Sequence, residues 1–335
     1  MNCKLLEIND LQTYFFTDEA TVKALDGVSF DINRGEVLGV VGESGCGKSV
    51  TALSILRILG ERGRIVGGSI VFHRNEDSVD LATLNPRSKE MMSIRGKEIS
   101  MIFQEPMTSF SPVHTIGNQI MEAMIIHQQL DKKEARELAV EMLRSVNIPR
   151  PETCVDRYPH QLSGGMRQRA MIAMALSCNP KLLIADEPTT ALDVTIQAQI
   201  LALMKELQKE SEMSIMMITH NLGVVAETSK NVVIMYLGRI VESGTVQQVF
   251  HNPLHPYTRA LLRSIPKLGK KQGKRLASIE GTVPDASRIP PGCSFHPRCE
   301  SFIRGVCDVK KPEIVDAGDS HRVSCHLYGG TYDGE

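Results

Sequence analysis

The sequence predicts an α/β protein built on a largely parallel sheet, and three observations carry that prediction. Compact apolar runs, typical of buried strands, recur at residues 36–41, 181–185 and 215–218. Segments with helical periodicity lie between them, and the clearest begin near Asp131 and Val194. A glycine-rich loop follows the first of these strands and leads into an apolar helix. This β–α alternation predicts a parallel sheet covered by helices, with a helical insertion in the middle of the chain.

Local patterns justify the elements in chain order. Residues 26–32 alternate apolar and polar side chains, as a half-exposed strand does, and residues 36–41 are rich in β-branched side chains. Asp131, with Glu134 three residues later, is related to a capping box. The helix that follows is expected to bury Ala135, Leu138, Ala139, Met142, Leu143 and Val146. The helix from Val194 is expected to bury Ile196, Ile200, Leu203, Met204 and Leu207.

Composition excludes several classes of protein. The chain has 335 residues, 42% of them apolar, which is enough for about two folded domains. It carries 38 basic and 39 acidic residues, which disfavours a nucleic-acid binder that relies on bulk positive charge. Aromatic residues make up 4% and tryptophan is absent, which weakens any interpretation based on stacked bases or sugars. No apolar run approaches the roughly 18–20 residues of a spanning helix, and acids stand where a signal peptide needs an apolar core, so we expect a cytosolic chain.

The organisation changes near residue 250. Residues 252–256 are a helix-breaking cluster, and the region beyond is rich in Pro, Gly and Cys with little periodicity. Residues 266–275 contain five basic residues and no acid, so they form either a solvated linker or a site for acidic lipid headgroups or phosphates. The expected division is one domain at 1–250, with a helical subdomain at about 112–175, and an extension at 251–335.

Residues 42–49, Gly-Glu-Ser-Gly-Cys-Gly-Lys-Ser, match the phosphate-loop pattern G-x-x-x-x-G-K-[ST] between a predicted strand and an apolar helix. Backbone N–H groups of such a loop surround phosphate oxygens, and the helix N-terminus adds partial positive charge. We expect Lys48 to reach the β- and γ-phosphates of a nucleotide and the Ser49 hydroxyl to bind Mg²⁺. The full set of expected contacts is Gly42, Ser44, Gly45, Cys46, Gly47, Lys48, Ser49 and Val50.

The apolar strand at 181–185 ends in two adjacent carboxylates, Asp186 and Glu187. Ligands of open α/β sheets bind beyond the carboxyl ends of the strands. We therefore expect Asp186 to hold the metal and Glu187 to polarise the attacking water as a general base.

Residues 162–169, Leu-Ser-Gly-Gly-Met-Arg-Gln-Arg, form the most specific string in the chain. Alone, the string predicts a helix capped by Ser163. With the phosphate loop upstream and the carboxylate pair downstream, it resembles the signature of ATP-binding-cassette (ABC) ATPases. The resemblance extends, in the family's order, to Gln104 at the Q-loop, Asp193 at the D-loop and His220 as the switch histidine.

The resemblance implies a P-loop NTPase with a RecA-like core, an antiparallel β subdomain and a helical signature subdomain. Such domains pair head to tail, so Ser163 and Gly165 would contact ATP that is bound to a second cassette. His220 would contact the γ-phosphate, and either Phe15 or Phe16 would stack on adenine. The implied catalytic residues are Glu187, His220, Lys48 and Gln104; the implied magnesium ligands are Ser49, Gln104 and Asp186; Asp193 is also expected at the nucleotide.

Residues 252–262, Asn-Pro-Leu-His-Pro-Tyr-Thr-Arg-Ala-Leu-Leu, resemble the C-terminal extension of oligopeptide and dipeptide importer ATPases. Residues 103–112 are similar to that subfamily's Q-loop, with Phe110, and then Val113, at positions where Leu is usual. The resemblance implies an ATPase subunit that powers import of di- or oligopeptides through two separate membrane permease subunits. The other implied partners are an identical or paralogous second cassette and, indirectly, an extracytoplasmic solute-binding protein.

This assignment places the chain as a peripheral protein on the cytoplasmic face of the cell membrane, without a nucleic-acid partner. Three alternatives remain open from the sequence. The chain could serve an importer of nickel, glutathione or another small solute, it could be a soluble ABC ATPase outside transport, or it could be a redox-sensing regulator.

Half of the eight cysteines lie in the last 43 residues, at Cys293, Cys299, Cys307 and Cys325. In a cytosolic chain such clustering indicates metal binding before disulfides, and four thiolates can hold Zn²⁺ or an iron–sulfur cluster. The spacing is wide and lacks a C-x-x-C pair. The resemblance to dipeptide-importer ATPases with a four-iron cluster implies [4Fe–4S], with zinc or free thiols as the alternatives. We expect the neighbouring histidines to lie in solvent or beside the ligands rather than to bind metal: His296, His321 and His326.

Overall fold

The computed structural model describes residues 4–74, 77–104, 109–190, 192–264 and 279–328. These form two compact units, each assembled from separate stretches of the chain. The first unit comprises residues 1–5, 32–37 and 73–218, and the second comprises 6–31, 38–72 and 219–335. Every helix in the described ranges is too short or too polar to cross a lipid bilayer.

The first unit contains the parallel strands β6 (Ile99–Ile102), β7 (Leu182–Asp186) and β8 (Ser214–Thr219), with β7 paired to both of the others. Every residue of β7 and β8 is buried, which explains their almost continuously apolar sequences. The strands that the sequence predicts at 181–185 and 215–218 are thereby confirmed. A short strand, β5 (Ser78–Asp80), belongs to the same unit.

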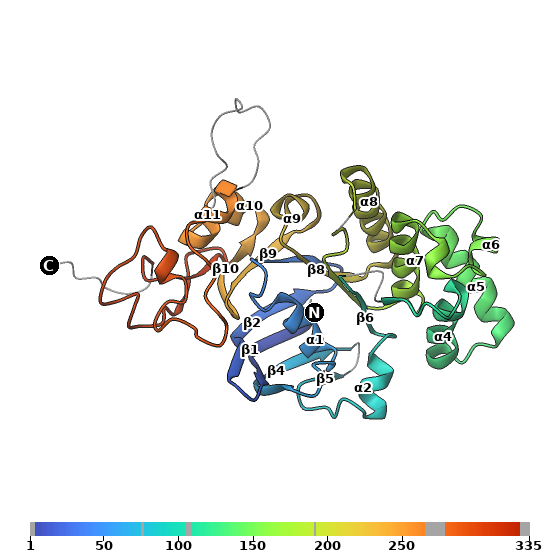
Figure 1. The fold of residues 1–335 in the computed structure, drawn as a ribbon, viewed down its shortest axis with the longest axis horizontal. Helices are drawn as coiled ribbons and strands as arrows, with labels where there is room; N and C mark the ends of the chain where they lie inside the picture. The colour runs from blue at the N-terminus through green and yellow to red at the C-terminus, as the bar shows by residue number, and fades with distance from the viewer. Residues whose placement is uncertain (1–3, 75–76, 105–108, 191, 265–278, 329–335) are drawn as a thin grey trace. The chain divides into compact units, whose positions relative to one another are not determined.

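Helices make up the rest of the first unit, and α4, α5, α6 and α7 pack against one another as one group (Figure 1). The bounds are α2 (Lys89–Ile94), α4 (Ile116–Gln128), α5 (Lys132–Ser145), α6 (Pro151–Cys154), the 3₁₀ turn η1 (Pro159–Gln161), α7 (Gly164–Leu176) and α8 (Val194–Ser211). Phe110, one of the two positions that depart from the subfamily pattern, is buried, whereas Val113 is exposed.

The capping box at the start of α5 is confirmed, because Asp131 and Glu134 make both of its reciprocal hydrogen bonds. The predicted apolar face of this helix is too wide. The buried residues within the helix follow a narrow i, i+4 stripe, and Val146 at its C-cap is buried as predicted, but Leu138 lies outside the stripe and is exposed. The fully buried members of the stripe are Ala135, Ala139 and Leu143.

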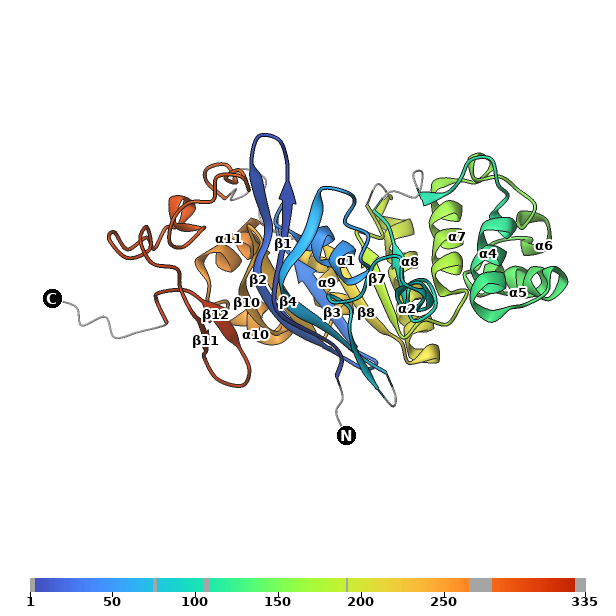
Figure 2. The same cartoon turned by 90° about the horizontal axis from the view of Figure 1, so that it is seen from below.

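The second unit contains the long strands β1 (Lys4–Phe16), β2 (Thr21–Asn33) and β4 (Gly63–His73), and β1 pairs antiparallel with β4 (Figure 2). A second set of strands begins with β3 (Val37–Val41), which pairs parallel with β9 (Asn231–Tyr236). The strand order then continues antiparallel through β10 (Arg239–Thr245), β12 (Arg322–Ser324) and β11 (Ile314–Asp316). The C-terminal region therefore adds two strands to this sheet, which the sequence does not predict.

The helices of the second unit are α1 (Lys48–Ile55), α9 (Leu222–Thr228), α10 (Val246–His251), α11 (Pro256–Ser264) and the 3₁₀ turn η2 (His296–Arg298). One buried core joins Val41, at the end of β3, to Tyr236 of β9 and to Tyr257 and Phe295 of the C-terminal region. The strand that leads into the phosphate loop thus shares its core with the extension. The basic segment at 266–275 lies outside the described residues.

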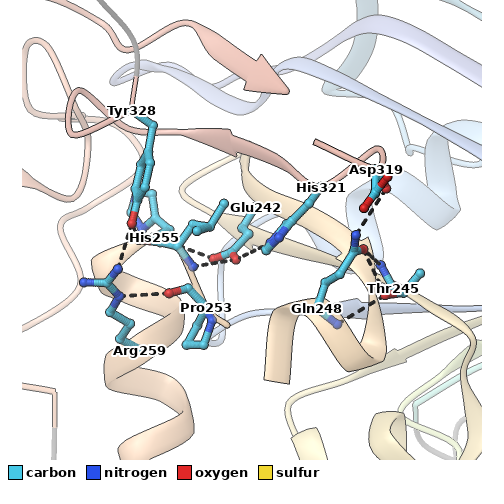
Figure 3. Close-up of polar contacts among 10 residues, drawn as sticks. Glu242, Thr245, Gln248, Pro253, His255, Arg259, Asp319, His321 and Tyr328 are labelled. Atoms are coloured by element: carbon cyan, nitrogen blue, oxygen red, sulfur yellow. Dashed lines mark hydrogen bonds and ion pairs between the residues drawn. The ribbon is translucent and has the colours of Figure 1, made fainter. Parts of the chain in front are cut away.

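A buried carboxylate fixes the start of the extension. Glu242 on β10 is completely buried and accepts hydrogen bonds from Leu254 N at 2.8 Å, His255 N at 2.9 Å and His321 Nε2 at 2.8 Å (Figure 3). Figure 3 also shows Arg259 bound to Tyr328, at 2.7 Å. Of the two placements expected for His321, the one in solvent is wrong, because this ring is buried against Glu242.

Candidate functional site

The phosphate loop has the strand–loop–helix setting that its pattern requires: β3 ends just before it and α1 begins at Lys48. Gly47 has a φ of 103°, and a Cβ atom there would lie 2.7 Å from the Ala24 carbonyl oxygen. A Cβ at Gly42 would collide with the Met235 carbonyl oxygen. Glycine is needed at both positions, so that the backbone can turn tightly against its neighbours.

Lys48 is held within its own loop. Its Nζ donates to the carbonyl oxygens of Gly42 at 2.8 Å and Glu43 at 3.0 Å. Ser44 and Gly45 are exposed at the tip, whereas Cys46 is buried and burial raises the pKa of its thiol. The loop therefore presents its tip to solvent and keeps the cysteine as a neutral packing group. Ser49 and Val50, in the first turn of α1, are half-buried.

Glu187 is held by two side-chain donors. Its Oε2 accepts from Gln104 Nε2 at 3.1 Å and from Thr190 Oγ1 at 2.8 Å. Its φ is 46°, in the left-handed region, and its N–H donates to the Ile218 carbonyl oxygen at 2.9 Å. A non-glycine residue in that region is costly and recurs at functional sites. The preceding Asp186 is buried at the end of β7, as the sequence predicts.

Thr190 is a contact of Glu187 that sequence reasoning missed. A hydroxyl three residues after the second carboxylate was the available signal, and the left-handed turn at Glu187 makes the contact possible. The first unit thus brings Gln104, Glu187 and Thr190 together.

Two capped helix starts meet in the first unit. Ser163 Oγ accepts from Met166 N at 3.3 Å and caps α7, and Asp193 accepts from Ile196 N at 2.9 Å and caps α8. A Cβ at Gly165 would lie 3.2 Å from Ile196 Cγ2, so the two starts lie against each other. Ser163 is exposed, which leaves the start of α7 accessible to a partner.

The remaining expected nucleotide contacts belong to the second unit. His220 is exposed directly after β8. Phe16 is 45% exposed, while Phe15 is half-buried, with its ring beside Gly63. Tyr14 donates from its hydroxyl to Asp26 at 3.2 Å. The assignment of adenine to Phe15 or Phe16 stays a prediction.

The four clustered cysteines share one neighbourhood in the second unit. Burial, followed by the charges of the Cys307, Cys325 and Cys299 thiols, raises the pKa of Cys293 to about 11. Cys293 N also donates to the Cys307 carbonyl oxygen at 2.8 Å. No group of three or more His, Cys, Asp or Glu side chains in the described part of the chain is arranged to hold a metal ion.

Comparison with known proteins agrees with this geometry. Residues 25–190 match the family model of the ABC transporter, and residues 241–307 match that of the oligopeptide/dipeptide transporter C-terminal region. The oligopeptide transport ATP-binding protein AppD of Bacillus subtilis is 52% identical over 325 residues, which cover 97% of each chain. The dipeptide transport ATP-binding protein DppD of Haemophilus influenzae is 47% identical, over 96% of this chain and 95% of its own length.

Comparison with solved structures also finds ABC proteins. The dimeric ATP-binding cassette MJ0796 bound to ADP and Pi has a TM-score of 0.63 and 25% identity, over 72% of this chain and 98% of its own. The cbiO1 protein of Clostridium perfringens, part of an ABC transporter complex, has a TM-score of 0.62 and 28% identity, over 75% of this chain and 92% of its own. The predicted α/β P-loop fold is confirmed. The chain belongs to the ABC transporter family, as an ATPase that carries the oligopeptide/dipeptide transporter C-terminal region.

Proposed function

We propose that this chain hydrolyses ATP to power the import of di- or oligopeptides through separate membrane permease subunits. The observation that carries the proposal is the near-complete coverage of peptide-transport relatives, with the extension included. The ATP site belongs to the cassette, which ABC proteins of many functions share, so the extension is the part that points to peptides.

In this proposal Glu187 takes the proton of the attacking water. Gln104 and Thr190 both donate to its Oε2, which restrains the orientation of the carboxylate. Lys48 and the N–H groups of residues 45–50 neutralise the phosphates, and His220 contacts the γ-phosphate. Phe15 or Phe16 stacks on adenine.

Ser49, Gln104 and Asp186 supply hydroxyl, amide and carboxylate oxygens, the ligand types that Mg²⁺ prefers. Because Gln104 turns its Nε2 toward Glu187, its Oε1 is the atom that is left to bind metal. When bound, Mg²⁺ neutralises charge that develops on the β- and γ-phosphate oxygens.

The active form is a pair of cassettes, identical or paralogous, in which Ser163 and Gly165 of one act on ATP held by the other. Exposure of Ser163 at the start of α7 supports this role, since a helix N-terminus favours an anion. Asp193 lies at the neighbouring start of α8, on the side expected to meet the second cassette.

Two permease subunits would hold the pair at the cytoplasmic face of the membrane, and a solute-binding protein would deliver the peptide on the other side. The division into a cassette at 1–250, with its helical subdomain at about 112–175, and an extension at 251–335 belongs to the same proposal.

We also propose that Cys293, Cys299, Cys307 and Cys325 hold a [4Fe–4S] cluster. What supports this proposal is the chemistry of the four residues, which are free cysteines that share one neighbourhood of the second unit, and not their present arrangement, which does not form a metal site. Anaerobically purified protein should contain about four irons per chain and absorb broadly near ~400 nm. Cys325→Ser should lower the iron content. A preparation with one zinc per chain and no iron would instead indicate that the four cysteines form a zinc site.

The test of the ATPase is Glu187→Gln in the assembled transporter. Loss of a general base should reduce Mg²⁺-dependent hydrolysis by roughly 10²-fold or more while ATP still binds. Glu152→Gln is the matched control, because Glu152 is an exposed carboxylate paired with Arg144. Full turnover in Glu187→Gln would remove this residue as the base.

A further inference from the structure

We propose that Tyr257 and Arg298, both in the C-terminal extension, are positioning residues for the phosphate loop, and that they couple the fold of the extension to ATP binding. The inference rests on the proposed ATPase function. Both side chains contact Glu43, the second residue of the loop.

Glu43 is engaged through its backbone and its side chain. Its N–H donates to Tyr257 Oη at 2.9 Å. Its carboxylate receives two parallel hydrogen bonds from Arg298, at 2.7 Å from Nη1 to Oε2 and at 3.1 Å from Nη2 to Oε1. Its carbonyl oxygen accepts from Lys48 Nζ, at 3.0 Å. The extension therefore holds the same residue that the phosphate-binding lysine contacts.

The guanidinium of Arg298 cannot easily leave this position. Its side chain is 4% exposed, whereas the Glu43 side chain is 24% exposed. Arg298 Nε donates to the Glu280 carbonyl oxygen at 3.1 Å, and the guanidinium lies 5.9 Å and 6.0 Å from the ring centroids of Tyr236 and Phe295. A bidentate pair of hydrogen bonds to a carboxylate is strong and directional, and separation of the two side chains would leave a buried charge without its counter-ion.

Tyr257 is equally constrained. It is completely buried, and its ring centroid lies 4.7 Å from that of Tyr236 and 5.3 Å from that of Phe295. The residues just before it are fixed by Glu242, which accepts from the N–H groups of Leu254 and His255 (Figure 3). The extension is thus anchored to β10 at one point and holds the phosphate loop at another.

This arrangement couples ATP binding at the phosphate loop to the fold of the extension. The loop N–H groups bind phosphate only in one backbone geometry, and the contacts to Glu43 restrict the loop to the geometry seen here. Their loss should weaken ATP binding and raise KM, while kcat at saturating ATP changes little because the hydrolytic carboxylate is untouched. By reciprocity, ATP binding should stabilise the extension.

The experiment compares Arg298→Met, Tyr257→Phe and Glu43→Gln in the full transporter. Arg298→Met keeps the apolar stem but removes the charge, and Tyr257→Phe removes only the hydroxyl. The control is Arg263→Met, because Arg263 is also in the extension and pairs with Glu300 at 2.9 Å, but both side chains are more than half exposed.

We expect Arg298→Met to raise the Kd for ATP about tenfold, Tyr257→Phe to raise it a few-fold, and Arg263→Met to leave it unchanged. Combining Arg298→Met with Glu43→Gln should cost no more than Arg298→Met alone. Arg298→Lys should restore part of the affinity. Hydrogen exchange over residues 254–259 and 293–300 should slow on ATP binding in the wild type and lose that response in Arg298→Met. Iron content, measured in each variant, separates a direct effect from damage to the cysteine site.

Unchanged ATP affinity in both Tyr257→Phe and Arg298→Met, in folded protein, would overturn the inference. A loss of ATP affinity in Arg263→Met equal to that in Arg298→Met would also overturn the inference. If Arg298→Met fails to fold, Tyr257→Phe and Glu43→Gln still decide the question. A wild-type protein that does not bind ATP would instead refute the proposed function.

Discussion

Glu242→Gln should loosen the junction between β10 and the extension selectively. The carboxylate is completely buried and receives three hydrogen bonds, two at Oε1 from Leu254 N and His321 Nε2, and one at Oε2 from His255 N. Glutamine has nearly the same shape but one acceptor oxygen. Its amide nitrogen must therefore face at least one of these donors.

The magnitude follows from that geometry. The least costly orientation places the amide nitrogen against His255 N–H, so that two buried donors face each other without an acceptor, at a cost of at least about 1–3 kcal/mol. The other two hydrogen bonds lose their charge assistance, at about 1 kcal/mol each. The expected loss is about 3–5 kcal/mol at this junction.

Amide hydrogen exchange measures this loss of stability directly, because the N–H groups of Leu254 and His255 are donors to Glu242. Their protection should fall by roughly two to three and a half orders of magnitude, since each 1.4 kcal/mol is about tenfold. Glu152→Gln is the control: its 2.6 Å ion pair with Arg144 is exposed and contributes at most about 1 kcal/mol. Protection unchanged in Glu242→Gln, or reduced equally by the control, would refute the reasoning.

Three further predictions follow from single side chains. Burial lowers the pKa of His255 to about 3, so between about pH 6.5 and 3 the unfolded chain binds a proton that the native state excludes. The free energy of unfolding should therefore fall by about 1.4 kcal/mol per pH unit as the pH drops through that window. In His255→Asn, the slope of the unfolding free energy against pH should be smaller by the amount that corresponds to one proton. Thr190→Val removes a donor to Glu187 and should lower kcat up to about tenfold without a change in ATP Kd; an unaltered kcat would count against this role. Asp131→Ala removes the cap of α5 and should cost about 1 kcal/mol in urea unfolding, and no measurable loss would contradict it.

Short-range patterns made most of the cassette predictable. The phosphate loop, the strand ending at Asp186 and the capping box at Asp131 each depend on residues within a few positions of one another. Periodicity gave the helix at 132–145 but misplaced Leu138, because the width of a buried face depends on the neighbouring helices.

Long-range contacts were not predictable in the same way. Glu43 meets Tyr257 and Arg298, which are 214 and 255 positions away, and no local pattern links them. The burial of His321 was not predictable for the same reason, because it depends on Glu242, which lies 79 positions earlier. The strands at 314–316 and 322–324 have only three residues each, too few for a period of two to be visible.

Peptide uptake tests the central claim most directly. A strain that lacks this chain should be assayed for accumulation of a labelled dipeptide and a labelled oligopeptide, with the wild-type chain or Glu187→Gln returned to it. The account predicts that the wild type restores uptake of at least one peptide and that Glu187→Gln, present at equal abundance, restores neither. Equal uptake with Glu187→Gln would contradict the claim that ATP hydrolysis by this chain powers peptide import.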